Sequence, residues 1–164
     1  MNPDVVKEKL ASRFGSDLIQ VENYRGQVIV SVPGQKIIQI CKYLRDEPDL
    51  RFDYLSFVAA LDRMPGSPRF ELVYQLYSTK FNNRLRLKAF AIENEAGDAS
   101  MDSVFSVWPT ADWHERETAE MFGITFNNHP DPRKLLLPEE WNVHPLRKDF
   151  PLAGSDQDTP DLPK

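Results

Sequence analysis

The sequence has a single cysteine, Cys41, among its 164 residues, and this scarcity excludes several kinds of site. One cysteine permits no internal disulfide and fits a reducing compartment. A self-contained iron–sulfur cluster or a thiolate zinc site needs about four ligands, so neither can be built from this chain. We expect Cys41 to be a buried core residue, because free cysteine usually packs as a small hydrophobic side chain.

Glycine and long apolar runs are also scarce. The seven glycines are never spaced as in GxGxxG or a phosphate-cradling loop, which excludes nucleotide sites of those kinds. The longest apolar run covers residues 57–61, whereas a membrane span needs about 20 residues. The N-terminus lacks the basic start and apolar stretch of a signal peptide. These absences predict a cytosolic location.

Positive charge is not in excess, because 20 Lys and Arg residues face 25 Asp and Glu residues and the formal net charge is −5. Nucleic acid is therefore not expected as the main partner, since phosphate neutralisation requires clustered basic residues. The same balance argues against direct binding to an anionic membrane surface. The segments RKLLLP and PLRKDFP set basic residues among apolar ones, a composition more typical of a protein interface.

The residues that are present predict a folded domain that begins with a helix. Hydrophobic residues make up 41% of the chain and aromatic residues 11%, which argues against disorder. Val6, Leu10 and Phe14 share one helical face, in a helix that starts at Pro3 and ends at Gly15. Two short strands within residues 17–32, joined by a turn at residues 24–26, should follow.

A second helix is predicted after Pro33, because apolar residues recur there at helical spacing. These residues are Ile37, Ile40, Cys41 and Leu44. Residues 50–61 have the composition of a buried strand, and residues 69–92 alternate as an antiparallel hairpin that turns at Asn82-Asn83. Two helices and consecutive hairpin strands predict an α+β fold, with an antiparallel sheet and helices packed on one face.

Residues 101–108 allow two interpretations, a short helix or a turn followed by a strand. The next segment predicts a helix that Thr110 or Asp112 caps, with a capping-box spacing from Asp112 to Glu115. Gly123 is placed to end this helix in a left-handed cap. Arg116 lies four residues from both Asp112 and Glu120, so we expect it to be held between two carboxylates.

From residue 124 onward the chain carries seven of its thirteen prolines. Each proline removes an amide donor and favours extended backbone before it, so neither a helix nor a central strand can persist. The apolar content nevertheless stays high, which a solvated linker would not need. We therefore predict an α+β domain over residues 1–123, an extended docking strap over residues 124–154 and a loose tail over residues 155–164.

Candidate catalytic and metal sites in this region are weakly supported by their spacing. Glu115, Glu117 and His114 could form an acid–base cluster, but neighbouring helix positions point about 100° apart and do not converge. His114, His129 and His144 do not have the spacing of a compact metal motif. A role in partner binding or packing is the favoured interpretation for these side chains.

The helix and the strap together resemble the signature of the C-type subunit family of proton-pumping NADH-quinone oxidoreductase, respiratory complex I. The matching positions are Glu115-Arg116-Glu117, Glu120-Met121-Phe122-Gly123, His129, Arg133 and Leu135-Leu136, followed by LLLPEEW and HPLRKDFPL. The upstream segments RFELVYQLYS and RLRLKAF are similar to that family's strand pair, and the resemblance covers about residues 30–154. The chain departs at Ala119-Glu120, where the family commonly has an aromatic residue and Asp.

This resemblance implies a non-catalytic subunit of the peripheral arm, at the cytoplasmic face of the bacterial inner membrane, with only indirect membrane contact. NADH, FMN, iron–sulfur clusters and quinone would be held by other subunits, and this chain would hold no cofactor. The partners implied are the quinone-site (D-type) and iron–sulfur (B-type and I-type) subunits. The candidate interface residues are Glu115, Arg116, Glu117, Glu120, Phe122, His129, Arg133, Leu136, Trp141, His144, Arg147, Lys148 and Phe150.

Two alternatives remain open from the sequence. Energy-converting hydrogenases and dehydrogenases fed by other electron donors use similar subunits, and the donor site would lie on another chain. A free-standing enzyme that uses Glu115, Glu117 or His114 belongs to a different class, and it would show turnover by the isolated chain.

Overall fold

The structure, a computed structural model, describes residues 3–15 and 20–152. Residues 17–19 of the predicted first strand, residues 153–154 of the predicted strap and the predicted tail at 155–164 lie outside the described residues. The described chain contains the three predicted helices, and they are α1 (Pro3–Phe14), α2 (Ile37–Asp46) and α3 (Ala111–Phe122). A 3-10 turn at Gly34–Lys36 delays the start of α2 relative to Pro33.

Five strands form the main sheet, in the order β1-β2-β5-β4-β3. Their bounds are β1 Gln20–Tyr24, β2 Gln27–Val32, β3 Tyr54–Asp62, β4 Phe70–Ser78 and β5 Asn83–Phe90. Every neighbouring pair is antiparallel except β2 and β5, which run parallel. The predicted α+β class is confirmed, while the parallel pair makes the sheet mixed rather than wholly antiparallel.

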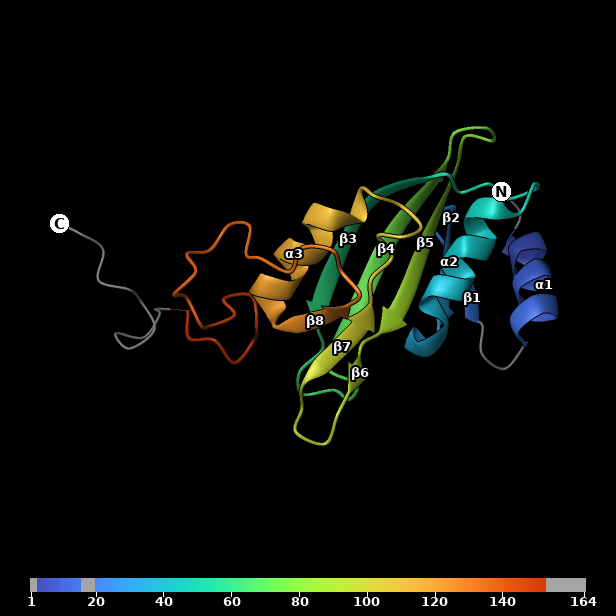
Figure 1. Cartoon of the computed structure of the whole chain (residues 1–164). Helices are drawn as coiled ribbons and strands as arrows, with labels where there is room; N and C mark the ends of the chain where they lie inside the picture. The colour runs from blue at the N-terminus through green and yellow to red at the C-terminus, as the bar shows by residue number, and fades with distance from the viewer. Residues whose placement is uncertain (1–2, 16–19, 153–164) are drawn as a thin grey trace.

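One hydrophobic core lies between the helices and the inner face of this sheet, and α2 and α3 stand in front of the strands in Figure 1. Leu85 and Leu87 of β5 are fully buried, whereas the alternating Arg84 and Arg86 point to the opposite face. Cys41 is fully buried in the core, as predicted, and burial raises the pKa of its thiol. Because all three helices join this single core, the opposite face of the main sheet is not covered by them.

A second, three-stranded sheet was not predicted. It has the order β6-β7-β8, with β6 at Ile92–Glu93, β7 at Ala99–Asp102 and β8 at Ile124–Asn127. Both interpretations of residues 101–108 were wrong, because a strand comes first and a turn follows it. Residues 124–127 had been assigned to the strap, but they pair in parallel with β7 and bury Ile124 and Phe126. No proline interrupts these four residues, so their apolar alternation can form an edge strand.

Helix α3 carries the carboxyl-terminal segment and ends as predicted. Gly123 has a φ of 69° in the left-handed region, and its amide donates to Ala119 O. Thr110 occupies the N-cap position, but its hydroxyl donates to Leu55 O on β3 instead of capping the helix. The predicted capping box does not form, because the Glu115 carboxylate is fully buried and bound elsewhere.

Candidate functional site

The proline-rich segment at residues 128–152, called the strap from here on, folds back on the carboxyl end of α3, at the end of the molecule remote from α1 (Figure 1). The sequence predicted a segment that must lie along another surface. Within the described residues, that surface is the chain's own helix and the β3–β4 connection.

The Glu120 carboxylate holds the strap by its backbone. It accepts three successive main-chain N–H groups, from Leu135 at 3.0 Å, Leu136 at 2.9 Å and Leu137 at 3.2 Å. Glu120 is only 5% exposed, so these charge-assisted bonds are shielded from water. A carboxylate near a helix C-terminus is disfavoured by the helix dipole, and the three amides offset that cost.

Arg116 does not sit between Asp112 and Glu120 as predicted. Its guanidinium donates to Arg133 O at 2.8 Å and Lys134 O at 3.1 Å, and it approaches the Asp131 carboxylate at 3.5 Å. The helical i, i+4 pairs are replaced because unpaired strap carbonyls and Asp131 lie over the same helix face. Arg133 also binds Asp131, and this guanidinium lowers the pKa of the Asp131 carboxyl.

The last carbonyls of α3 are capped by residues 144–147 of the strap. His144 Nδ1 donates to Glu120 O at 2.7 Å, and Leu146 N donates to Met121 O at 3.2 Å. The Arg147 guanidinium donates to Phe122 O at 2.6 Å. A helix leaves its final carbonyls without intrahelical partners, and here the strap supplies the donors. Burial lowers the pKa of His144.

Lys134 organises the strap internally. Its ammonium donates to Glu139 O at 2.9 Å and Pro138 O at 3.3 Å, and also to Trp141 O. These carbonyls belong to the turn after the leucine run, where prolines prevent regular backbone pairing. The Lys134 ammonium therefore binds strap carbonyls and the Glu120 carboxylate binds strap amides, in place of the backbone pairing of a helix or a sheet.

The end of the strap is anchored to the β3–β4 connection. Asp62 accepts Arg69 Nη2 at 2.8 Å and the main-chain N–H of Lys148 at 2.8 Å, and its side chain is 3% exposed. Arg69 also donates to Asp149 through both terminal nitrogens, at 2.8 and 3.0 Å. The Arg69 guanidinium lowers the pKa of the Asp62 carboxyl and of the Asp149 carboxyl.

The start of the strap meets a buried polar group around Glu115. The Glu115 carboxylate accepts Ser103 Oγ at 2.5 Å and Val104 N at 2.8 Å, and burial raises its pKa to about 7. His129 Nδ1 accepts the Asp131 amide, so the ring proton lies on Nε2, which donates to Asp112 O at 3.2 Å. His129 Nε2 also lies 3.8 Å from the Glu115 carboxylate.

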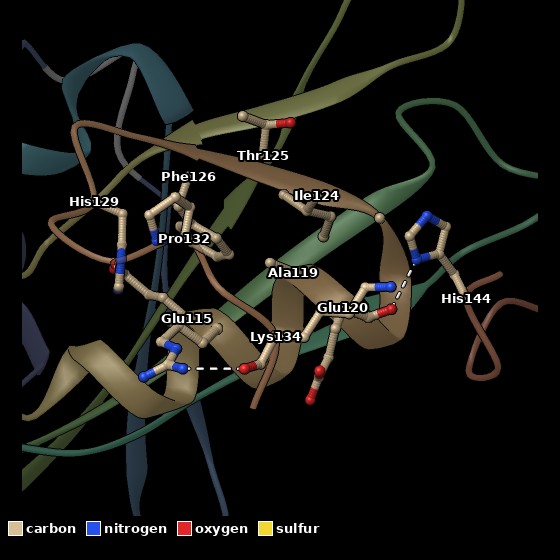
Figure 2. Close-up of a pocket in the computed structure, with 12 residues that line it drawn as sticks. Glu115, Ala119, Glu120, Ile124, Thr125, Phe126, His129, Pro132, Lys134 and His144 are labelled. Carbon is tan, nitrogen blue, oxygen red and sulfur yellow. Dashed lines mark hydrogen bonds and ion pairs between the residues drawn. The ribbon is translucent and has the colours of Figure 1, made fainter. Parts of the chain in front are cut away.

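A cavity of about 340 Å³ lies between α3, β8 and the strap. Figure 2 shows Ala119 of α3 on the side of β8 that carries Ile124 and Phe126, the Glu120 carboxylate pointing away from that strand, and strap residues His129 and Lys134 beside the helix. Its polar side chains are largely committed to main-chain groups. The arrangement is suited to holding a chain segment in place. The acid and the base that meet at its edge, Glu115 and His129, have side chains only 0% and 3% exposed, and both are engaged by neighbouring groups.

His114, His129 and His144, the three histidines considered above as metal ligands, do not meet at one point. His129 packs near Glu115 while His144 caps the other end of α3. Across residues 3–15 and 20–152, no three His, Cys, Asp or Glu side chains are grouped so that they could hold a metal ion. The described chain also contains no helix long and apolar enough to cross a membrane.

The structure divides the predicted interface residues into two sets. Glu115 is fully buried and Glu120 nearly so, and Arg116, His144 and Arg147 are engaged within the chain. Phe122 packs edge-to-face on Phe70. Others reach the surface; Leu136 is 61% exposed, and Glu117, Arg133 and Lys148 are exposed, while Trp141 and Phe150 are half-buried.

Several residues that hold the site were not predicted. Asp62, Arg69 and Asp149 form its far anchor, but the pairing spans 80 residues between Arg69 and Asp149 and leaves no local pattern. Ser103 likewise gave no signal, because its role depends on a buried carboxylate twelve residues away. The sequence marks Lys134 only as one of the basic residues in RKLLLP, although its three carbonyl partners follow within seven residues.

The fold and the site define a class of protein: an α+β domain whose carboxyl-terminal segment is clamped across its last helix, with polar groups used for positioning. Residues 30–156 match the family described as "Respiratory-chain NADH dehydrogenase, 30 Kd subunit". The chain belongs to this family.

Individual relatives agree with that assignment. The chain is 43% identical over 150 residues to the C-type subunit of NADH-quinone oxidoreductase from Geotalea uraniireducens, covering 92% of this chain and 88% of that protein. It is 44% identical to the same subunit from Citrifermentans bemidjiense, with coverages of 92% and 90%. A chain in the structure of the membrane-bound sulfane sulfur reductase, an archaeal respiratory membrane complex, shares the fold with a TM-score of 0.72 at 22% identity, covering 91% of this chain and 85% of that one.

Proposed function

We propose that this chain is a non-catalytic structural subunit of the peripheral arm of a proton-pumping NADH-quinone oxidoreductase. Its family membership over residues 30–156 is the observation that carries the proposal. The chain would lie at the cytoplasmic face of the bacterial inner membrane and pack against the quinone-site and iron–sulfur subunits. NADH, FMN, iron–sulfur clusters and the quinone, whether ubiquinone or menaquinone, would be bound by those other chains.

The geometry of the strap supports a docking role. The strap is fixed in part through its backbone groups, which bond to Glu120 and Arg116, so some of its large apolar side chains can face outward. Leu136 is 61% exposed and Leu146 56% exposed, and Trp113 on α3 is 66% exposed. Large apolar side chains held rigidly at a surface are typical anchors of protein interfaces.

The alternative of a free-standing acid–base enzyme has less support. Glu115 has no exposed surface and binds Ser103 and Val104, whereas Glu117 is exposed on another face of α3. The equivalent subunit of an energy-converting hydrogenase, or of a dehydrogenase fed by another electron donor, would have the same fold. Genes beside this one would separate these assemblies, since the electron-donor site lies on another chain.

The test is a mild-detergent native gel of membranes, probed for this chain. Migration in a large complex with NADH dehydrogenase activity is the expected result, and recovery only as a free monomer would overturn the proposal. Glu117→Gln serves as the enzyme control, because an acid–base enzyme would lose turnover and a structural subunit would not.

A second experiment tests the strap as the docking element. A cut after Gly123 would remove Ile124 and Phe126 from the core, so the chain should instead be truncated after Asn128. The truncated chain should retain its sheet by circular dichroism and fail to enter the complex. Normal assembly of a folded truncated chain would show that docking lies elsewhere.

A further inference from the structure

The face of the main sheet opposite the helices carries arginines that no carboxylate of the described residues neutralises. Arg84 and Arg86 stand on β5, and Arg25 lies in the adjoining β1–β2 turn. Among residues 3–15 and 20–152, none of the three forms an ion pair. Arg86 reaches only the amide oxygen of Gln75, at 3.4 Å, and Arg25 lies over the ring of Tyr24.

Two adjoining depressions contain these arginines. One, of about 560 Å³, lies across β3, β4 and β5 and is lined in part by Tyr54, Phe57 and Tyr77. The other, of about 510 Å³, lies beside the β1–β2 turn, and the two share Gln27 and Arg84. Within the part of the chain that the structure describes, no Asp or Glu lines either depression, although the whole chain has a net charge of −5.

A β-bulge in β3 gathers the aromatic side chains on this face. The register shifts between Leu55 and Phe57, so Leu55 enters the core while Tyr54 and Phe57 remain outside. Tyr54 is 49% exposed and Phe57 36% exposed. The bulge therefore places two large rings beside Arg84 and Arg86, which face them from β5 across β4.

The floor of the first depression is held by hydrogen bonds of Gln75, and an ion pair marks where the unpaired positive charge on β5 ends. Gln75 is 8% exposed; it accepts Gln27 Nε2 at 2.9 Å and donates to Leu85 O at 3.2 Å. Farther along β5 the positive charge ends, because Lys88 pairs with Glu71 at 3.3 Å. The arginines without an ion pair thus lie in the part of the face that the rings border.

We propose that these two depressions dock an acidic, extended segment of a neighbouring subunit, with its carboxylates on Arg84 and Arg86. An apolar side chain of that segment would lie against Phe57. Charge complementarity selects an acidic partner, since bidentate carboxylate binding is the geometry that arginine favours. Arginine and aromatic residues together are typical of interface centres. The inference rests on the proposed function, because it takes the partner to be a subunit of the same assembly, and it adds a surface separate from the strap.

The experiment places a photo-crosslinking amino acid at Phe57 in the full chain, expressed in cells, and purifies the assembled complex before irradiation. Comigration of the chain with the complex tests the proposed function independently of the docking surface. Mass spectrometry then identifies the cross-linked peptide, which is expected to be an acid-rich segment of another subunit. The same amino acid at Glu95, in the exposed turn between β6 and β7, is the position control.

Charge reversal supplies the specificity test. Arg84→Glu with Arg86→Glu should lower the cross-linked fraction at least about tenfold, because like charges then face each other. Lys7→Glu with Lys42→Glu changes the net charge equally at exposed sites on α1 and α2 and should not lower it. Replacing the identified partner carboxylates by lysine should restore cross-linking to the reversed chain. If the reversed chain does not fold, Arg84→Gln with Arg86→Gln replaces it.

The outcomes separate the two proposals. A chain that enters the complex but cross-links at Phe57 to nothing, to a non-acidic segment, to lipid, to nucleic acid or to its own residues 153–164 overturns the docking surface alone. Cross-linking that survives both arginine double variants also overturns it. A chain that never enters the complex overturns the proposed function and this inference together.

Discussion

The main-chain N–H of Leu136 donates to Glu120 Oε1 at 2.9 Å, across sixteen residues of sequence. The same carboxylate binds the amides on either side of Leu136. A single acidic side chain near the end of α3 thus sets the position of the leucine run through its backbone amides.

Glu120→Gln should loosen this part of the strap. Glutamine keeps one acceptor oxygen but loses the charge, and hydrogen bonds to charged groups contribute about 1.5–3 kcal/mol each. The amides of residues 135–137 should exchange hydrogen at least about tenfold faster in the purified chain. Glu117→Gln, on an exposed face of the same helix, should leave their exchange unchanged. Equal protection in both variants would contradict the role assigned to Glu120.

Gly123→Ala should destabilise the chain in two ways. A Cβ there would meet Arg147 Nη2 and come within 2.5 Å of the His144 ring, and its left-handed backbone disfavours any side chain. Gly97→Ala is a matched control, because Gly97 has a φ of 84° and nothing within 4 Å of an added Cβ.

The control isolates the contact with the strap. Both variants should lose about 1 kcal/mol from backbone strain, and Gly123→Ala should lose more and expose residues 144–147 to exchange. The free energies of unfolding in urea measure the difference. Equal losses of unfolding free energy in the two variants would mean that the strap can move away from α3 without destabilising the chain.

Glu115 should make stability depend on pH. Burial raises its folded-state pKa from 4.5 to about 7, so the folded chain binds more protons than the unfolded chain between those values. Stability from this group is therefore highest at low pH and is lost as pH rises from about 4.5 through about 7. Asp112 adds to the rise in pKa, while the bonds from Ser103 and Val104 oppose it; His129 Nε2 also faces the carboxylate.

Glu115→Gln should remove this dependence. Its amide can donate to Ser103 Oγ and its oxygen can accept Val104 N, so both contacts can persist. The variant should be more stable than the parent chain at pH 8, with little difference near pH 4.5. Glu117→Gln should retain the parent's pH dependence. A Glu115→Gln variant with unchanged pH dependence would show that another group is responsible.

The two aspartates that bind Arg69 should contribute unequally. Asp62→Asn should cost about 2–4 kcal/mol, because its 3%-exposed side chain also accepts two main-chain amides. Asp149 is 45% exposed, and Asp149→Asn should cost about 1 kcal/mol or less. Both carboxyl pKa values are lowered, so these contributions are present above the ordinary Asp pKa and are lost on acidification. Thermal unfolding at pH 7 ranks the variants, and equal shifts would contradict the difference in burial.

The periodicity of the sequence predicted the elements whose residues are close together in the chain. The three helices, the β4–β5 hairpin and the left-handed end at Gly123 follow from patterns within about a dozen residues. The parallel pairing of β2 with β5 could not be predicted this way, because the two strands are separated by α2 and by two other strands. Strand β8 was missed because the prolines after it dominated the interpretation of the whole segment.

The site shows the same limit. Glu120 was expected to hold Arg116, and instead it binds amides fifteen to seventeen residues away. A carboxylate can satisfy an arginine or a row of amides equally well, and only the path of the strap decides between them. Family resemblance drew attention to this segment, while the internal use of its charged residues required the three-dimensional arrangement.

The contacts of the strap also impose an order of events. Its anchors are the carboxyl end of α3 and the Asp62–Arg69 pair at the β3–β4 connection, surfaces that exist only after the sheet and helix have formed. The docked strap therefore marks a finished domain, and a neighbour that recognises its outward leucines would recruit completed chains and pass over unfinished ones.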